Sequence, residues 1–535
     1  MINIIVGNVN SKIVNAQPAI LSAIEKILTA TVANCWFSPA YKSGRWDGTV
    51  KMFDRKNGNT FPTGLLYMVT DLLDEVCDDD DFTYKILDKR TCKEFMVDPD
   101  KFKEIVLKGS NKQLRDYQVS SVNDVINNQL KDMNWQRGIL NLATNGGKTV
   151  IAEAIIQLIY PSLQEKYLFS GSDVKSQPVF MFLTHSKEIA YQAKKSFEND
   201  LGISVGIIGD GKWQEDLVTI GIIPTLASRQ KNNKPEYLDL ANRVVGFVGD
   251  EAHHGSSDTY NTVLCSFKNA VVRLGLTGTV EKDDSRRMKL FGATGPVISK
   301  VKNSYLIKNG YSAKPQYWMV PIDYPDVDEV IAPNEEGERD YGKIYDMGVV
   351  NNMWRNYLIA KICEKEVHEN NGQVLVLVDR LEHGANICEC FDYLDSDVRR
   401  AFLYGDLSSE ERQEGLEKLV NKELDVLIAT TILDEGVDVP NINALIYARG
   451  GKSIRKLLQG VGRGLRKKED GSDLRIYDFI DDTSYVLVKQ SQQRLNIMTN
   501  EKFKCRKLKT NKIGITDKEF QVVMRDLDRS DDYRR

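Results

Sequence analysis

Two short segments about a hundred residues apart constrain this chain more than any other feature. The first, Ala143–Thr149, ends in Gly-Gly-Lys-Thr, and the second, Asp250–His253, follows the apolar run Val244–Val248. A Gly-Lys-Thr loop offers backbone N–H groups, an ammonium and a hydroxyl to phosphates and Mg²⁺. A buried parallel strand would deliver two carboxylates at its carboxyl end, one for Mg²⁺ and one for an attacking water. Together the segments predict a nucleoside-triphosphate site.

The first segment departs from the usual phosphate loop at two positions. Leu142 stands where a small residue is common, and Asn145 stands where glycine is common. Asparagine tolerates the left-handed backbone conformation better than most residues, so the tight turn stays feasible. The carboxylates Asp250 and Glu251 make the nucleotide interpretation specific, because two separate fragments agree in order and spacing.

Length and composition set the class of protein. A chain of 535 residues is too long for one core, and 41% hydrophobic with 28% charged residues is typical of globular proteins. No run approaches the ~18 apolar residues of a membrane span, and Met1–Gly7 resembles a first strand rather than a signal peptide. We therefore expect a cytoplasmic protein with no membrane partner. The net charge of −4 argues against a protein that coats nucleic acid, but not against local phosphate contacts.

Two α/β repeats are predicted from alternating apolar runs and helical periodicity. We expect a small α+β domain at 1–105, an α/β lobe at 106–320, a linker at 321–344, a second α/β lobe at 345–485 and a locally basic tail at 486–535. The strands expected in the two lobes are Val179–Leu183, Leu217–Gly221, Val244–Val248, Val272–Leu276, Val374–Val378, Arg400–Tyr404, Asp425–Ala429, Ala444–Ala448 and Arg475–Ile480.

The first 105 residues combine turn signals with interleaved basic and aromatic side chains. Asp47-Gly48 and Asn57-Gly58 predict a hairpin within 46–61. Basic residues beside Trp46 and Phe53 suit contact with a nucleic-acid backbone and stacking on bases, although the same aromatic residues could instead form the domain core. The basic residues are Lys42, Arg45, Lys51, Arg55 and Lys56. The acidic run Cys77–Asp81 is interpreted as a solvated loop, and the scattered cysteines as reduced thiols rather than a zinc site.

Near the other end, Gln459–Arg466 carries Arg463 and Arg466 three residues apart, on one face of a predicted helix. A guanidinium grips phosphate oxygens and stabilises transition-state charge. A solvated basic face is the ordinary alternative, but Gly462 and Gly464 are poor helix formers and weaken it.

The order of these and further segments resembles superfamily 2 helicases and translocases over residues 110–485. The segments that carry the resemblance are Leu114–Gln118, Ala143–Thr149, Leu183–Glu188, Ile222–Leu226, Asp250–His253, Leu276–Thr279, Val376–Arg380, Ala429–Thr431 with Asp434–Pro440, and Gln459–Arg466. The resemblance implies that the two α/β lobes are RecA-like, preceded by a small α+β nucleic-acid recognition domain, with ATP and Mg²⁺ as cofactors.

The resemblance also implies a role for individual residues. Nucleotide binding falls to Arg115, Gln118, Thr144, Asn145, Gly146, Gly147, Lys148, Thr149 and Asp438. Catalysis falls to Lys148, Asp250, Glu251, Arg463 and Arg466, with Mg²⁺ held by Thr149 and Asp250. Coupling of hydrolysis to motion falls to His253, Thr277, Thr279 and Gln459. Nucleic-acid contacts fall to Ser186, Thr225, Arg380 and Thr430, and Trp46, Arg45 and Lys51 of the first domain join them on physical grounds.

Trp46-Asp47-Gly48, the Asp-Glu-Ala-His-His sequence and the tail look similar to the UvsW-type branch-migration helicases of tailed phages. This similarity implies an ATP-dependent DNA helicase that acts on forks, Holliday junctions or displacement loops in recombination-linked replication. Its partners would be branched DNA and single-strand-binding or recombination proteins. An RNA helicase or RNA-remodelling ATPase remains the main alternative, since the motifs do not separate DNA from RNA. A non-catalytic nucleic-acid clamp is disfavoured, because a clamp would not need a complete hydrolytic site. The motor subunit of a restriction nuclease is disfavoured, because the sequence shows no obvious nuclease segment.

Overall fold

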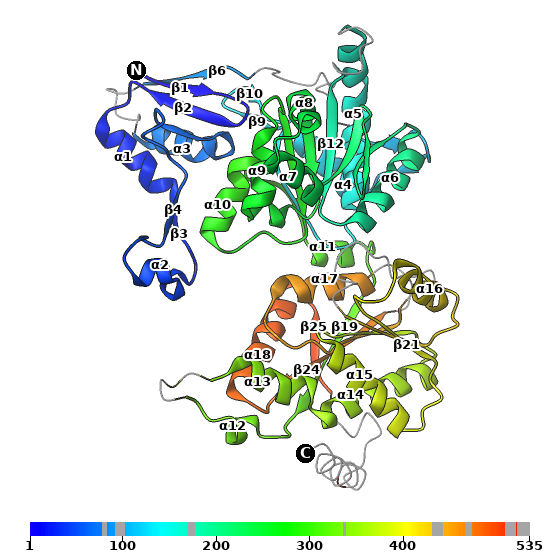
Figure 1. Cartoon of the computed structure of the whole chain (residues 1–535). Helices are drawn as coiled ribbons and strands as arrows, with labels where there is room; N and C mark the ends of the chain where they lie inside the picture. The colour runs from blue at the N-terminus through cyan, green and yellow to red at the C-terminus, as the bar shows by residue number, and fades with distance from the viewer. Residues whose placement is uncertain are drawn as a thin grey trace. The chain divides into compact units, whose positions relative to one another are not determined.

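The computed structural model describes residues 1–76, 83–90, 102–169, 177–334, 337, 339–430, 442–465, 473–508 and 521. The chain divides into two compact units, Met1–Val301 and Lys302–Arg535 (Figure 1). The first unit contains a small mixed sheet and one large sheet, and the second contains the other large sheet. The predicted fold class, two RecA-like α/β lobes after a small mixed domain, is confirmed.

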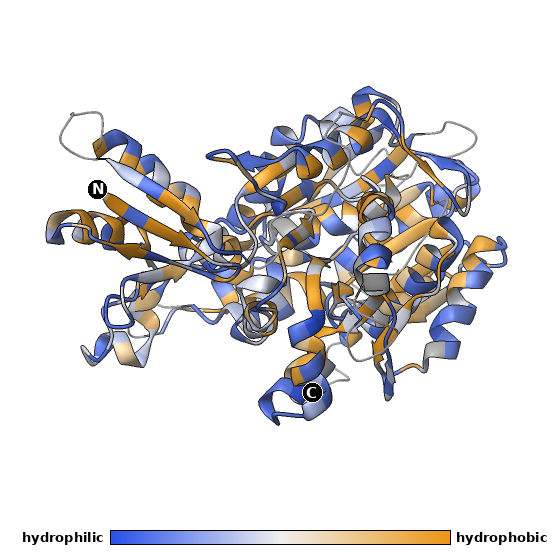
Figure 2. Ribbon diagram, turned by 90° about the horizontal axis from the view of Figure 1, so that it is seen from above, coloured by the Kyte–Doolittle hydropathy of each residue, from blue (hydrophilic) through white to orange (hydrophobic). Residues whose placement is uncertain are grey.

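A small mixed sheet with strand order β5-β2-β1-β6 opens the first unit. Alternate residues of β1 face the core, where Ile2, Ile4 and Val6 are buried among side chains of α1 and α3. Figure 2 shows the strands of this N-terminal sheet as largely hydrophobic ribbons. The elements of this domain are β1 (Ile2–Val6), β2 (Asn10–Val14), α1 (Pro18–Ile27), β5 (Thr60–Pro62), α3 (Leu66–Val76) and β6 (Tyr84–Asp88).

The predicted hairpin over 46–61 is wrong for most of its length. β4 (Thr49–Lys51) pairs antiparallel with β3 (Thr29–Thr31), and only one bridge, between Asp54 and Thr60, closes the Asn57-Gly58 turn. The chain between β3 and β4 forms a short 3₁₀ turn and the helix α2 (Pro39–Lys42). Turn signals located the turn at 57–58, but pairing partners far away in sequence leave no local signal.

Within the described residues, the first large sheet has eight strands in the order β14-β13-β15-β12-β16-β17-β11-β18. Every neighbouring pair is parallel except β13 with β14. Its strands are β11 (Arg137–Leu142), β12 (Val179–Thr184), β13 (Gly206–Gly209), β14 (Lys212–Gln214), β15 (Val218–Ile222), β16 (Val244–Gly249), β17 (Val272–Thr277) and β18 (Val297–Val301).

Helices cover both faces of this sheet. Phe180 and Phe182 of β12 belong to a core shared with the helices α4, α5 and α6, whereas Met181 and Leu183 belong to a core shared with α7, α8 and α9. Such burial on both faces explains why the strands are almost continuously apolar. The helices are α4 (Asp116–Ile126), α5 (Lys148–Phe169), α6 (Lys187–Leu201), α7 (Ile223–Lys231), α8 (Pro235–Arg243), α9 (Asp258–Ser266) and α10 (Asp284–Ala293).

The N-terminal domain is joined to the first lobe through a buried arginine. Arg137 is 1% exposed, and its guanidinium donates to the carbonyl oxygens of Thr294 (2.8 Å) and Asn8 (3.2 Å). The indole of Trp135 packs into the core of the N-terminal domain. The two parts of the first unit therefore share buried polar and apolar contacts.

In the second unit, the described residues form a parallel sheet with strand order β21-β22-β20-β23-β24-β19-β25. Val374 and Val376 pack on the side of α14 and α15, and Leu375 and Leu377 pack on the side of α17 and α18. The elements are α11 (Asn303–Lys308), β19 (Pro315–Ile322), α14 (Met353–His368), β20 (Val374–Leu377), α15 (Leu381–Tyr393), β21 (Arg400–Leu403), α16 (Ser409–Val420), β22 (Val426–Ala429), β23 (Ala444–Tyr447), α17 (Ile454–Gly464), β24 (Leu474–Asp481), α18 (Tyr485–Asn500) and β25 (Lys504–Lys507).

Three elements of the second unit, the strands β19 and β25 and the helix α18, come from segments that we had assigned elsewhere. β19 spans the expected boundary between first lobe and linker, and the expected tail supplies α18 and β25. α18 is polar in sequence because it buries Arg494, which donates to Asp478 at 2.9 Å. Among the described residues, no helix combines the length and apolar composition needed to cross a bilayer. The predicted acidic loop at 77–81 lies outside the described residues, as do residues 509–520 and 522–535 of the tail.

Candidate active site

The phosphate loop and the two carboxylates leave the first sheet at the same edge. β17 lies between β11 and β16, and all three strands are parallel, so their carboxyl ends are neighbours. The loop after β11 and the carboxylates after β16 therefore approach each other. Lys148 Nζ lies 2.7 Å from Glu251 Oε1, although 103 residues separate the two in sequence.

The loop itself turns through two left-handed residues. Asn145 and Gly147 have φ angles of 68° and 69°, so Asn145 does take the conformation that its side chain tolerates. The Gly146 N–H donates to the Ala143 carbonyl oxygen at 2.9 Å and closes the turn. α5 then begins at Lys148, which places the amino end of a helix at the predicted phosphate position.

The start of α4 packs against this loop. Gly147 has a φ of 69°, and a Cβ atom added there would lie 2.2 Å from Gln118 Nε2, so a larger residue would be strained and would displace the Gln118 side chain. Gln118 is 4% exposed, and its Oε1 accepts from the Arg115 N–H at 2.9 Å. The hydroxyl of Tyr117, which we had not singled out, donates to the Gly146 carbonyl oxygen at 3.1 Å. Its position between Arg115 and Gln118 was the available sequence signal.

The surroundings of Asp250 and Glu251 shift the pKa values of these two carboxyl groups in opposite directions. Burial and the neighbouring Glu251 carboxylate raise the pKa of Asp250. Burial also disfavours the charged form of Glu251, but the Lys148 ammonium and His253 outweigh it and hold its pKa below the usual range. Glu251 therefore stays ionised to a lower pH than Asp250, which suits an acceptor that orients a water molecule.

His253 connects the carboxylate segment with the end of β17. Its Nδ1 lies 3.3 Å from Thr277 Oγ1 and 3.3 Å from Glu251 Oε2. The Thr277 hydroxyl donates to the Thr279 carbonyl oxygen at 2.8 Å. The structure therefore brings together three of the four residues predicted to couple hydrolysis to motion.

The expected Mg²⁺ ligands have suitable chemistry. Thr149 and Asp250 offer a hydroxyl and a carboxylate, which are hard oxygen donors of the kind that Mg²⁺ prefers. Within the described ranges, no group of three or more His, Cys, Asp or Glu side chains is arranged to hold a metal ion. Mg²⁺ in phosphoryl-transfer sites is commonly held by one or two protein ligands and by substrate phosphates. The donor set thus fits an ion that binds with the nucleotide.

The predicted strand-contacting residues of the first lobe lie at adjacent strand ends. Ser186 follows β12 and Thr225 follows β15, and these two strands are parallel neighbours. The Ser186 hydroxyl caps α6, accepting from the Ile189 N–H at 3.4 Å and donating to Glu188 at 2.7 Å. Thr225 is half-buried in the first turn of α7.

The predicted contacts of the N-terminal domain are more varied. Trp46 is half-buried, and its Nε1 donates to the Thr49 carbonyl oxygen at 2.8 Å. Phe53 is 5% exposed and belongs to the domain core. For this residue, the alternative that it forms the core rather than stacks on bases is therefore correct. Arg45 is exposed, and Lys51 lies near carboxylates at 3.9–4.0 Å.

The second unit contains the remaining predicted site residues. Arg380 follows β20 and Thr430 follows β22, its parallel neighbour. Arg380 is exposed, pairs with Asp346 and lies over the Tyr345 ring, 5.1 Å from its centroid. Thr430 is 6% exposed. Gln459 is buried in α17, and the backbone of Arg463 lies in the same helix. Asp438 and Arg466 lie outside the described residues.

Two family profiles match this chain. The profile described as "Type III restriction enzyme, res subunit" matches residues 111–282, and "Helicase conserved C-terminal domain" matches residues 357–468. Together they cover more than half of the chain.

Individual relatives extend the comparison. Putative helicase 22 of Sulfolobus islandicus filamentous virus is 23% identical over 413 residues, which are 75% of this chain and 69% of that protein. ATP-dependent DNA helicase uvsW of Enterobacteria phage T4 is 22% identical over 460 residues, 83% of this chain and 84% of that one. The solved structure of the ATP-dependent Type ISP restriction-modification enzyme LlaBIII bound to DNA has a TM-score of 0.52 at 15% identity, covers 82% of this chain and 34% of its own, and shares the fold. The chain belongs to the superfamily 2 helicases and is an ATP-dependent helicase or translocase.

Proposed function

We propose that this helicase acts on DNA, and that its preferred substrates are branched: forks, four-way junctions or displacement loops. The observation that carries the proposal is a segment of exposed aromatic and basic side chains in the N-terminal domain, which is fixed to the first lobe. The similarity to a phage protein named as an ATP-dependent DNA helicase supports DNA as the substrate class.

The ion pair between Lys148 and Glu251 sets the order of events at the nucleotide. Without a phosphate, the ammonium is neutralised by Glu251 at 2.7 Å. The oxygens of a γ-phosphate would compete for Lys148 and release Glu251, which then accepts a hydrogen bond from the attacking water. Thr149 and Asp250 would hold the Mg²⁺ that neutralises charge developing on the phosphates.

Hydrolysis is relayed through His253. Because His253 contacts both Glu251 and Thr277, a change in the charge near Glu251 alters the hydrogen bonds at the end of β17. Thr277 in turn holds the turn at Thr279. We propose that this chain of contacts transmits the loss of the γ-phosphate to the loops that hold the DNA strand.

The strand is held by its phosphates. Ser186 and Thr225 follow neighbouring strands of the first sheet, and Arg380 and Thr430 follow neighbouring strands of the second. Hydroxyls, backbone N–H groups and an arginine contact phosphates without reading sequence. We expect DNA affinity to fall steeply with salt concentration. For each phosphate contact, the logarithm of the affinity should fall by about 0.7–0.9 per tenfold increase in salt. The affinity should vary little with DNA sequence.

Branch preference is assigned to the segment between β3 and β4. Trp36 and Phe37 are 54% and 65% exposed, and their ring centroids lie 6.0 Å apart. Lys42 and Arg45 are exposed just beyond them in the same segment. An aromatic side chain can stack on the base pair at a branch point, which lacks a stacked neighbour, while the cations contact phosphates.

The test is the ATPase rate with single-stranded DNA, duplex DNA, a four-way junction and RNA, measured side by side. The proposal expects strong stimulation by DNA, with the junction at least as effective as single strands at limiting concentration. Stimulation by RNA alone would support the RNA-remodelling alternative. A lack of hydrolysis with every polymer would support a binding clamp instead.

A further inference from the structure

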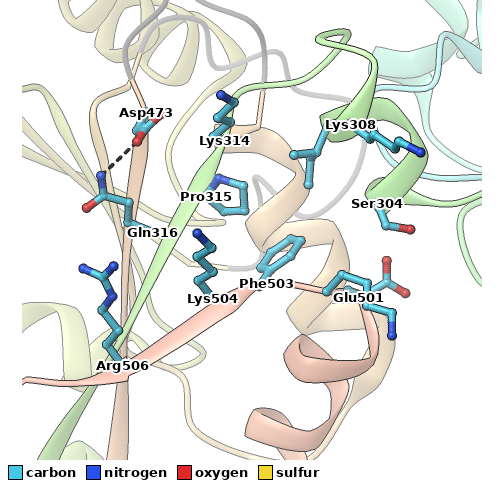
Figure 3. Close-up of a pocket in the computed structure, with 12 residues that line it drawn as sticks. Ser304, Lys308, Lys314, Pro315, Gln316, Asp473, Glu501, Phe503, Lys504 and Arg506 are labelled. Atoms are coloured by element: carbon cyan, nitrogen blue, oxygen red, sulfur yellow. Dashed lines mark hydrogen bonds between the residues drawn. The ribbon is translucent and has the colours of Figure 1, made fainter.

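A basic pocket of about 570 Å³ lies in the second unit, where α11, the amino end of β19 and the segment from α18 to β25 meet (Figure 3). Besides the charged side chains, its lining includes Ser304, Pro315, Gln316 and Phe503. Most of the cations come from the locally basic segment that the motor's nucleotide chemistry does not use.

Positive charge dominates the pocket. The five cations are Lys308, Lys314, Lys502, Lys504 and Arg506. Over the described part of the chain, none of the five forms an ion pair with a carboxylate. The two carboxylates of the lining bond to amides instead: Asp473 accepts from Gln316 at 2.9 Å, and Glu501 accepts from Asn303 at 3.2 Å. The pocket therefore carries excess positive charge that a polyanion would neutralise.

The pocket lies at the opposite edge of the sheet from the predicted strand-contacting loops. Lys314 and Asp473 precede β19 and β24, and Lys504 begins β25, so the pocket lies at the amino ends of these strands. Arg380 and Thr430 follow the carboxyl ends of β20 and β22 in the same parallel sheet. β20 and β22 have four residues each, so the amino and carboxyl ends of these strands are about 13 Å apart at ~3.3 Å per residue.

Strand register directs two of the cations to one face. Lys504 pairs with Gln316, and Arg506 pairs with Trp318. Residues two apart along a strand share a face, so all four side chains lie on the same face of the sheet. The Arg506 guanidinium lies 5.4 Å from the centroid of the Trp318 ring. Stacking of this kind holds the guanidinium plane while its N–H groups remain available for bidentate contact with phosphate.

Part of the pocket lining is apolar and packed against the fold. Phe503 is 6% exposed, and its N–H donates to the Met498 carbonyl oxygen at 3.0 Å, which links the pocket to α18. Pro315 adds a second apolar surface. Cations around an apolar base suit a nucleic-acid strand, which presents phosphates together with sugars and bases.

We propose that this basic pocket is a second DNA-backbone site, which holds the strand outside the motor's own track and so lengthens the DNA footprint of the second unit. The inference rests on the proposed DNA substrate. A nucleic acid is favoured over an acidic peptide because the helicase already acts on a nucleic-acid polyanion. A strand longer than the motor's own site would reach the pocket, whereas a short strand would not.

The test uses the full chain with Lys504→Glu and Arg506→Glu combined. The control combines Lys489→Glu with Lys507→Glu, which reverses the same amount of charge at exposed positions on α18 and on β25 outside the pocket. Binding of a short and of a several-fold longer single-stranded oligonucleotide is measured by fluorescence anisotropy over a salt series.

For the long oligonucleotide, loss of two phosphate contacts should weaken binding about tenfold or more near ~0.1 M salt. It should also reduce the slope of log affinity against log salt by about 1.4 relative to wild type. The short oligonucleotide and the control variant should retain the wild-type slope.

Equal slopes for the pocket and control variants would overturn the inference, and would leave these cations the role of keeping an exposed edge strand from pairing with another sheet. Weakened binding of a poly-glutamate peptide with unchanged DNA binding would also overturn it, in favour of an acidic protein partner. ATPase stimulation by the short oligonucleotide separates the two proposals. If it persists, the proposed function survives a failure of the pocket, and if wild type shows none with any DNA, the proposed function itself fails.

Discussion

Lys148 and Glu251 form one electrostatic unit in the nucleotide site. Their 2.7 Å contact keeps the glutamate charged and gives the lysine a partner until phosphate arrives. Replacing either residue therefore changes more than one contact, and the two replacements have different signatures.

Lys148→Ala and Glu251→Gln should each lower kcat by roughly 10²-fold or more, because positioning and charge stabilisation carry most phosphoryl-transfer catalysis. Glu251→Gln should still bind ATP, since the amide leaves the phosphate loop and its lysine in place. Steady-state ATPase and equilibrium binding of a fluorescent nucleotide check both statements. Near-normal turnover in Glu251→Gln would remove that residue from the water-orienting role.

Trp36 is the residue to which we assign the proposed branch recognition. Trp36→Ala should weaken binding to a four-way junction by roughly 5- to 150-fold, because stacking on one base contributes about 1–3 kcal/mol to the binding free energy. Because the side chain is 54% exposed, the melting temperature should barely change. ATPase stimulation by single-stranded DNA should also stay near the wild-type rate.

The matched control for Trp36 is Tyr485→Ala, which removes an exposed aromatic side chain of the second unit. Equal junction affinities for the Trp36 and Tyr485 variants would contradict the stacking role. A lowered melting temperature in Trp36→Ala would instead indicate a structural role for the residue.

At the scale of elements, α5 carries a buried carboxyl that reports on its packing. Glu153 is fully buried and accepts from Ser196 of α6 at 2.6 Å. Burial raises its pKa to about 7, with the Ser196 hydrogen bond opposing this shift. The folded state therefore binds a proton that the unfolded chain has released above pH ~4.5, and stability should fall as pH rises from about 4.5 to 7.

Glu153→Gln should remove this dependence, since an uncharged amide can still accept from Ser196. The gain in unfolding free energy over wild type should be up to about 3 kcal/mol at pH 8 and much smaller near pH 5, measured by urea denaturation at both values. Glu165→Gln, an exposed position of the same helix, is the control. A gain that is the same at both pH values would show that the carboxyl ionises normally.

The sequence predicted the elements that have a local signal. Apolar runs located β12 and β16, and the tolerance of Asn145 for left-handed angles explained its place in the loop. α18 was missed because its buried face includes Arg494, whose charge is balanced by Asp478 across the fold. The hairpin at 46–61 was wrong because β4 pairs with a strand about twenty residues earlier.

The sequence predicted the motif residues of the candidate site, but it did not single out Tyr117 or Trp36. Motif order identified Lys148, Glu251 and His253, which the fold brings together. Tyr117 was missed because its role depends on a hydrogen bond to Gly146, a contact that sequence does not display. Trp36 was passed over for Trp46, although two adjacent aromatic residues in a polar segment were a usable signal.

For the whole molecule, hydrolysis is proposed to require residues of both compact units. Arg463→Ala, in α17 of the second unit, should lower kcat more than ATP affinity, because an arginine of this kind acts mainly in the transition state. Arg412→Ala, in α16, is the control. If kcat/KM falls only through KM in Arg463→Ala, the assignment of Arg463 to the transition state is wrong.

The central claim is that ATP hydrolysis moves DNA branches, and ATP-dependent migration of a synthetic four-way junction tests it most directly. The full chain should convert the junction into two duplexes in a gel assay with ATP and Mg²⁺. Glu251→Gln should bind the junction without converting it, and Trp36→Ala should convert it slowly. A wild-type protein that hydrolyses ATP on DNA but leaves the junction intact would contradict the claim.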